Sequence, residues 1–156
     1  MQAKEGVIER LNAVLTNELT AVNQYFLQAE MCRNWGLHGL HEKLREFSMM
    51  EMKDAQELIQ HILYLEGLPN LQRLGPVRIG ENALEHLQID LEYERATVDP
   101  LLREAITHCA QVGDYTTRKM FEEMIEDEEQ QVDWLETQME LVTQIGLQNY
   151  LTEQSS

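Results

Sequence analysis

Apolar residues recur every three or four positions along four long stretches of this chain, the spacing of helices that turn one face to a core. The expected helices span residues 4–34, 41–66, 82–111 and 114–144, with a short one at residues 147–152. Stop and turn signals separate them, at Trp35-Gly36, Gly67, Pro69, Gly113-Asp114 and Gly146. The pattern therefore predicts an all-α protein whose 156 residues form one domain.

The connection between the second and third helices, residues 67–81, is far longer than neighbouring antiparallel helices need. Such a crossover is typical of a four-helix bundle with one long link. Within it, residues 76–79 are expected to be extended, along the bundle or a neighbouring molecule. In the third helix Pro100 lacks a backbone donor, so a kink is expected there.

One glutamate interrupts the apolar line of each long helix near its middle: Glu18, Glu51, Glu94 and Glu128. Two of these helices carry a second polar side chain one turn later, Asp54 and Gln131. Burying unpaired carboxylates is costly, and no Lys or Arg shares these positions, so bound cations, protonation or a water-filled centre must stabilise them. Any one glutamate alone is equally well read as a solvated position. Four together favour a metal-binding bundle.

Di-iron carboxylate bundles use Glu-x-x-His on two helices, and here Asp54 and Gln131 stand at both x-x-His positions. The resulting all-oxygen ligand set suits magnesium, calcium or manganese better than iron, zinc or copper. Asp54 is shorter than His and adds a negative charge, whereas Gln131 is a neutral, weak ligand. Tyr25 lies on the same line and can donate a hydrogen bond to a carboxylate. The five histidines show no ligand spacing and receive no role.

Composition narrows the functional classes. Lys and Arg number 12 against 28 Asp and Glu, a net charge of −16, which disfavours nucleic acid and anionic membranes as partners. No apolar run is long enough to span a membrane, and the first residues lack an apolar signal core. Cys32 and Cys109 have no disulfide-framework or metal-finger spacing, so reduced thiols and a cytoplasmic location are expected.

Met52 lies about 100° around the second helix from Glu51, on a separate apolar seam. Its companions on that seam are Met49, Ile59 and Leu63. The second helix is therefore expected to turn an acidic line toward its own bundle and an apolar face with a thioether toward something else.

Several motifs make the chain resemble the bacterioferritins over nearly its whole length. They are residues 19–27 (LTAVNQYFL), 34–37 (NWGL), 51–53 (EMK), 63–71 (LYLEGLPNL), 114–115 (DY), 133–137 (DWLET) and 146–151 (GLQNYL). The resemblance implies a ferritin-like four-helix bundle with a long crossover and a short fifth helix. It also implies a cage of 24 identical or closely similar subunits. Such cages oxidise Fe(II) at a di-iron centre within each subunit and store ferric mineral.

The resemblance further implies haem b between two-fold-related subunits, ligated by Met52 of each, with Leu19, Asn23 and Phe26 in the surrounding pocket. It places di-iron ligands at Glu18, Glu51, Glu94 and Glu128, and the two family histidines at Asp54 and Gln131. Glu46 and Met50 likewise stand where the family's inner-surface iron site has His and Asp.

We therefore expect a haem-binding cage subunit that passes electrons to the mineral and has a degraded ferroxidase centre. The resemblance also implies a ferredoxin-like reductant. The cage consists either of this chain alone or of this chain together with a subunit that keeps the histidines. Two rival hypotheses remain. One is an active ferroxidase that uses Asp54 and Gln131 as ligands, and the other is a subunit that only builds the cage.

Overall fold

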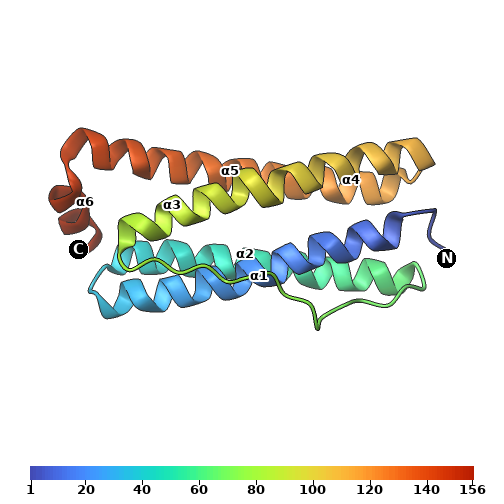
Figure 1. The fold of residues 1–156 in the computed structure, drawn as a ribbon, viewed down its shortest axis with the longest axis horizontal. Helices are drawn as coiled ribbons and strands as arrows, with labels where there is room; N and C mark the ends of the chain where they lie inside the picture. Colours follow the sequence, from blue (N-terminus) through green and yellow to red (C-terminus); the bar gives the residue numbers. More distant parts are fainter.

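The computed structural model describes residues 1–156 as helices joined by short turns and one long connection. The helices are α1 (Val7–Asn34), α2 (His38–Tyr64), α3 (Ala83–Tyr93), the π-helical turn η1 (Glu94–Val98), α4 (Asp99–Val112), α5 (Tyr115–Ile145) and α6 (Leu147–Gln154). Since η1 joins α3 to α4 without a break, four long rods form the bundle (Figure 1). The chain contains no strand, which confirms the predicted all-α bundle with a long crossover and a short fifth helix.

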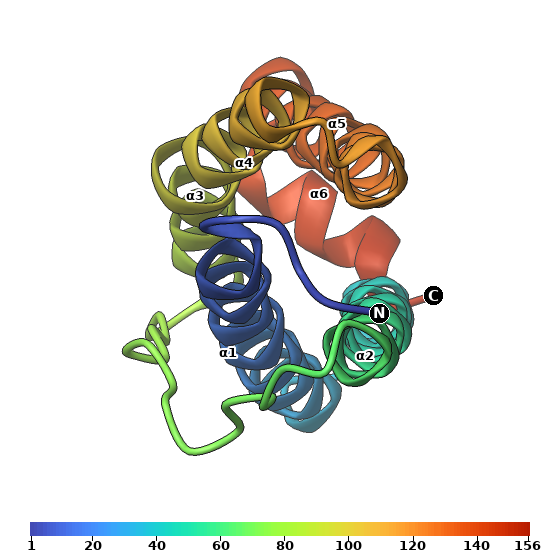
Figure 2. The ribbon, with the colours of Figure 1, turned by 90° about the vertical axis from the view of Figure 1, so that its right-hand side faces the viewer.

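The crossover sets the direction of the third rod. Figure 1 shows it leaving the end of α2 and returning beside α1 along the length of the bundle, so the α3–α4 rod runs in the same direction as α2. Seen end-on in Figure 2, the four rods occupy the corners of the bundle, and α6 lies across one end. None of the helices combines the length and apolar character needed to span a bilayer.

Helix ends differ from the expected positions by up to three residues. α1 begins at Val7 rather than near residue 4, because Gly6 adopts a left-handed conformation with φ of 74°. α2 begins at His38, three residues early, because the left-handed conformation of Gly36 at φ 81° reverses the chain within a short turn. It ends at Tyr64 because Glu66 takes φ of 62°. Asp114 caps α5 as expected, accepting a hydrogen bond from the Thr117 amide at 3.0 Å.

The irregularity expected at Pro100 lies just before it, in the π-helical turn. The Asp99 amide donates to the Glu94 carbonyl, a hydrogen bond that spans five residues instead of four. Pro100 follows within the first turn of α4, where a missing donor costs little. The extra residue in this turn advances the buried face, so Leu102, rather than Leu101 of the regular three-and-four spacing, faces the core.

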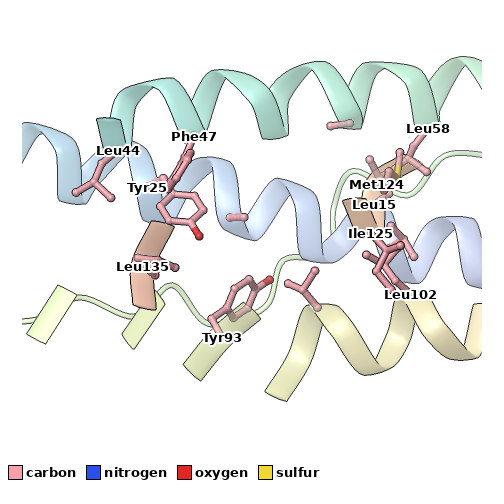
Figure 3. Packing of buried hydrophobic residues seen from close by; sticks show 14 of the residues in the cluster. Leu15, Tyr25, Leu44, Phe47, Leu58, Tyr93, Leu102, Met124, Ile125 and Leu135 are labelled. Atoms are coloured by element: carbon pink, nitrogen blue, oxygen red, sulfur yellow. The ribbon is translucent and has the colours of Figure 1, made fainter. Parts of the chain in front are cut away.

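The buried apolar side chains form one cluster along the bundle, and Figure 3 shows two groups within it. One contains Leu44, Phe47 and Leu135 with Tyr25, and the other contains Leu15, Leu58, Leu102, Met124 and Ile125. Phe47 packs edge-on against both Tyr25 and Trp134, with ring centroids 5.5 and 5.3 Å apart. On α1, α2 and α5 the core glutamate falls in sequence between residues of these two groups, and on the third rod Glu94 precedes Leu102. Apolar layers therefore close off the level of the glutamates from both ends.

A polar stripe on α1 binds the crossover. Its members share a four-residue spacing: Asn12, Thr20, Gln24 and Gln28. The Asn12 side chain accepts from the Asn70 amide at 2.7 Å, and Thr20 Oγ1 accepts from the Gly75 amide at 2.8 Å. Gln24 Oε1 accepts from the Arg78 amide at 3.0 Å. Side chains four apart share one helix face, so residues 76–79 lie along α1 of their own bundle.

Asp90 lies beneath this stripe, at a position that the sequence analysis did not single out. It is fully buried, and its Oδ1 accepts a hydrogen bond from Gln24 Nε2 at 3.0 Å. Its Oδ2 and the Oε1 of Gln28 both lack a donor. Burial raises the pKa of Asp90 to about 7, although hydrogen bonds from Gln28 and Gln24 oppose the shift.

Asp90→Asn is expected to stabilise the protein at pH 8. A folded-state pKa of about 7, above the ordinary 3.8, makes Asp90 destabilising as pH rises through this interval. The replacement removes that charge, still accepts from Gln24, and supplies an amide donor for Gln28. The free energy of unfolding should rise by about 1–2 kcal/mol at pH 8 and by clearly less at pH 5. Urea unfolding at both pH values measures this, and a gain of equal size at pH 5 would contradict it.

Candidate functional site

The four glutamates that interrupt the apolar lines meet in the middle of the bundle. Glu18 comes from α1, Glu51 from α2, Glu94 from the start of η1 and Glu128 from α5. Their exposed fractions lie between 1% and 6%. The structure thus places all four in the interior, between the two apolar layers, as their positions in the sequence indicate.

The tightest group within this layer contains Glu18, Glu51 and Asp54. Each offers a carboxylate oxygen, and these oxygens lie within 4.8 Å of one another. Glu51 and Asp54 are three residues apart on α2 and share a helix face, to which α1 adds Glu18. Three carboxylates this close repel one another unless protons or a cation lie between them.

Two side chains donate hydrogen bonds to glutamates of the layer. Gln131 is buried and donates from Nε2 to Glu51 Oε1 at 2.7 Å. The Tyr25 hydroxyl donates to Glu94 Oε1 at 2.7 Å, as the sequence suggested. One oxygen of each of three glutamates remains buried without a partner: Glu18 Oε2, Glu94 Oε2 and Glu128 Oε2.

Burial raises the carboxylate pKa values throughout the layer. The pKa of Glu51 rises to about 8, mainly through desolvation, although the Gln131 hydrogen bond opposes the shift. Desolvation also raises the pKa of Asp54 to about 7, with Asp127 as the next cause. The pKa of Glu128 rises to about 7 through burial and the neighbouring Asp99, and that of Glu94 rises well above its ordinary value. The layer therefore favours binding protons or cations at neutral pH.

Asp99 is a neighbour of this layer that the sequence analysis missed. Its carboxylate raises the Glu128 pKa, and it also accepts from Arg103 Nε at 2.8 Å. Asp99 lies five residues after Glu94, a spacing that only the π-helical turn brings toward Glu128. An ordinary helical wheel gives no signal for it.

A cleft of about 430 Å³ between α2 and α5 connects Asp54 to the surface. Its lining combines carboxylates with thioethers and one amine: Met50, Lys53, Asp54, Glu57, Met120, Glu123, Met124, Glu126 and Asp127. Because Asp54 belongs both to this lining and to the tight carboxylate group, the cleft opens the buried layer to solvent at Asp54.

The histidines lie elsewhere. His41, His61 and His108 bind a carbonyl or hydroxyl oxygen outside the layer. His86, expected at the edge of the core, is fully buried, stacks on Trp35 at 5.4 Å and lies 3.0 Å from the Gly80 carbonyl. The carboxylate layer thus fits a divalent cation with oxygen ligands, but it lacks the imidazoles of the di-iron arrangement.

The predicted haem residues lie on the opposite side of α1 and α2 from this layer. Met52 is 49% exposed, Phe26 is 46% exposed, Asn23 is exposed and Leu19 is half-buried. Ser48 Oγ donates to the Val22 carbonyl at 2.8 Å, which fixes the two helices so that these residues lie at a similar level. Glu46, by contrast, is exposed and forms a 3.7 Å ion pair with Lys43.

Without metal ions, the protein should lose stability as pH rises from about 5 to 8. Carboxylates with raised folded-state pKa values bind more protons folded than unfolded, so the free energy of unfolding falls over this interval. Glu94→Gln should then raise the free energy of unfolding at pH 8 by about 1–2 kcal/mol, because it removes one buried like charge. Urea unfolding in chelator measures both effects.

The matched control is Glu129→Gln, an exposed position on α5, which should change this free energy by less than about 0.5 kcal/mol. Equal midpoints for Glu94→Gln and the parent at pH 8 would indicate a solvated layer instead.

Comparisons with known proteins agree with this geometry. The Ferritin family, described as a ferritin-like domain, matches residues 8–145. A bacterioferritin of Rhodobacter capsulatus is 46% identical over 150 residues, which cover 96% of this chain and 92% of that protein. Bacterioferritins of Mycolicibacterium paratuberculosis and Brucella melitensis are each 44% identical, with 96% of this chain covered and 94% and 92% of theirs. The chain therefore belongs to the bacterioferritins and is an iron-storage subunit with the ferritin-like fold.

Proposed function

We propose that this chain binds haem b between two copies related by a two-fold axis, within an iron-storage cage of 24 subunits. One observation carries the proposal: the half-exposed thioether of Met52 on an apolar face of α2. Met49 and Leu63 are also exposed there, and Phe26 is exposed on neighbouring α1. Apolar side chains gathered on one face of a helix pair indicate a surface that another molecule covers.

Symmetry explains why one methionine is enough. A two-fold interface joins the same patch of both copies, so a residue near the axis appears twice, once on each side. Two Met52 side chains then supply a pair of equivalent thioether ligands, and methionine is an established haem ligand. Leu19 and Phe26 provide apolar surface for the porphyrin, and Asn23 lies at the edge. The haem supplies one-electron transfer when bound.

The crossover extends the same apolar surface. Leu68, Leu71, Leu74 and Ile79 are all exposed large apolar residues of the crossover. In Figure 2 the crossover bows outward beside α1, on the outside of the bundle. This additional apolar surface supports subunit association along the side that carries α1 and α2.

We further propose that iron oxidation in this chain alone is weak. Neither Asp54 nor Gln131 supplies the imidazole of a di-iron centre, and Gln131 acts as a donor to Glu51. The haem would then serve iron release, carrying electrons from a ferredoxin-like reductant toward ferric mineral. A partner subunit that keeps both histidines would oxidise the entering iron in a mixed cage.

The proximity of Glu18, Glu51 and Asp54 favours a second candidate, an active ferroxidase with an all-oxygen site. This alternative needs Gln131 to turn its amide oxygen toward iron. It also needs the Gln131–Glu51 hydrogen bond to break.

Met52→Leu tests the haem proposal. The change keeps the volume and apolarity of the side chain but removes the thioether, so at least about nine-tenths of the bound haem and its low-spin spectrum should be lost. Met49→Leu is the matched control, since Met49 is an exposed methionine on the same face, and it should bind haem like the parent. Absorption spectra and haem content per subunit measure the result. Unchanged haem in Met52→Leu would overturn the assignment.

Asp54→His combined with Gln131→His separates the two candidate functions. The double variant restores Glu-x-x-His on α2 and α5, so rapid, saturable Fe(II) oxidation should appear, at least tenfold faster than in the parent. Each single variant should gain less, because one metal position would still lack nitrogen. Stopped-flow absorbance measures the rate. The active-ferroxidase candidate is correct instead if the unmodified chain oxidises two Fe(II) per subunit in a fast phase that Glu51→Ala abolishes.

A further inference from the structure

We infer that the carboxylate layer binds one divalent cation per subunit, between Glu18, Glu51 and Asp54, and that Gln131 closes the position where a second would bind. The inference rests on the proposed loss of the di-iron centre and is independent of the haem. The cation belongs to the oxygen-preferring class of Mg²⁺, Ca²⁺ and Mn²⁺.

The three oxygens have the spacing of ligands around one ion. Oxygen ligands lie about 2.0–2.6 Å from these cations, so two on opposite sides of one ion are about 4–5 Å apart and adjacent ones are closer. The oxygens of Glu18, Glu51 and Asp54 lie within 4.8 Å of one another. A single central ion can therefore contact all three.

Glu18 gives an independent sign of a missing partner. Its side chain is only 4% exposed, yet Oε2 has no hydrogen-bond donor. An unsatisfied buried oxygen costs about 1–3 kcal/mol, and more when it is charged. Lys53 is exposed and lines the cleft beside Asp54, whose pKa it lowers. Neither Lys53 nor any other side chain donates to Glu18 Oε2. A cation that enters by the cleft satisfies Glu18 and offsets the repulsion among the three carboxylates.

Hydrogen-bond donors occupy the position where a second cation would bind. The Gln131 Nε2 atom donates to Glu51 Oε1 at 2.7 Å. Its hydrogens therefore occupy the place where a second cation would need an oxygen with a free lone pair. Gln131 is 2% exposed, so it has no room to swing into solvent. Tyr25 binds Glu94 in the same way at 2.7 Å. Glu94 and Glu128 lie outside the tight group of three oxygens.

The ligand set determines the class of ion. Three carboxylates and no imidazole or thiolate suit hard cations, and such ions retain water ligands. The cleft at Asp54 provides the access that water needs. Since α1 contributes Glu18 and α2 contributes the other two ligands, the ion also links these two helices. It acts as a resident counter-ion rather than as iron in transit.

Manganese titration of the full-length protein tests the inference. Protein stripped with chelator and dialysed is titrated with Mn²⁺, and free Mn²⁺ is followed by electron paramagnetic resonance. One ion per subunit should bind in the parent and be weakened at least tenfold in Glu18→Gln. Glu129→Gln, exposed on α5, is the matched control and should keep it. Weak sites that the parent and Glu18→Gln share belong to the acidic surface and are not counted.

Gln131→Glu provides a gain-of-site variant in case Glu18→Gln does not fold. It replaces the donor with a carboxylate, so the count should rise from one to two ions per subunit. Two tight ions in the parent, an unchanged count in Gln131→Glu, or equal affinity in parent and Glu18→Gln would each overturn the inference. Haem content and Fe(II) oxidation of the same preparation, measured before Mn²⁺ is added, report on the proposed function separately.

Discussion

The structure depends on how it accommodates like charges at its centre. Four glutamates from four rods and Asp54 occupy one level, closed at both ends by apolar layers. Desolvation is the largest cause that raises the pKa of Glu51 to about 8, and neighbouring carboxylates add to it. Tyr25 and Gln131 each satisfy one oxygen, but several others remain without donors. The bundle is therefore built to hold protons or a cation there.

Adjacent residues of α2 face different surroundings because of helical geometry. Glu51 points into the bundle, and Met52, about 100° further round, lies half-exposed on the outside. Residues of the carboxylate layer can therefore be replaced without a change in the apolar face that carries Met52. The carboxylate layer and the apolar face around Met52 share a helix but no side chain.

α1 supports this arrangement from three sides. One face packs against the core, a second carries Phe26 beside the apolar face, and a third binds the crossover through Thr20 and Gln24. The side-chain contacts to the crossover satisfy backbone groups of a connection that has no regular structure of its own. Because Gln24 also donates to Asp90, the anchor of the crossover reaches to the edge of the carboxylate layer.

The sequence alone determined the helix count, the crossover and the convergence of the core glutamates, because all three follow from local periodicity. It also placed Met52 on a face separate from Glu51. Tertiary structure decided the rest. The π-helical turn exchanged Leu101 for Leu102 and brought Asp99 to Glu128, since an extra residue in one turn shifts every later side chain. Only packing between rods decided that Gln131 donates to Glu51 and that Asp90 lies beneath the crossover, because both contacts join residues more than 60 positions apart.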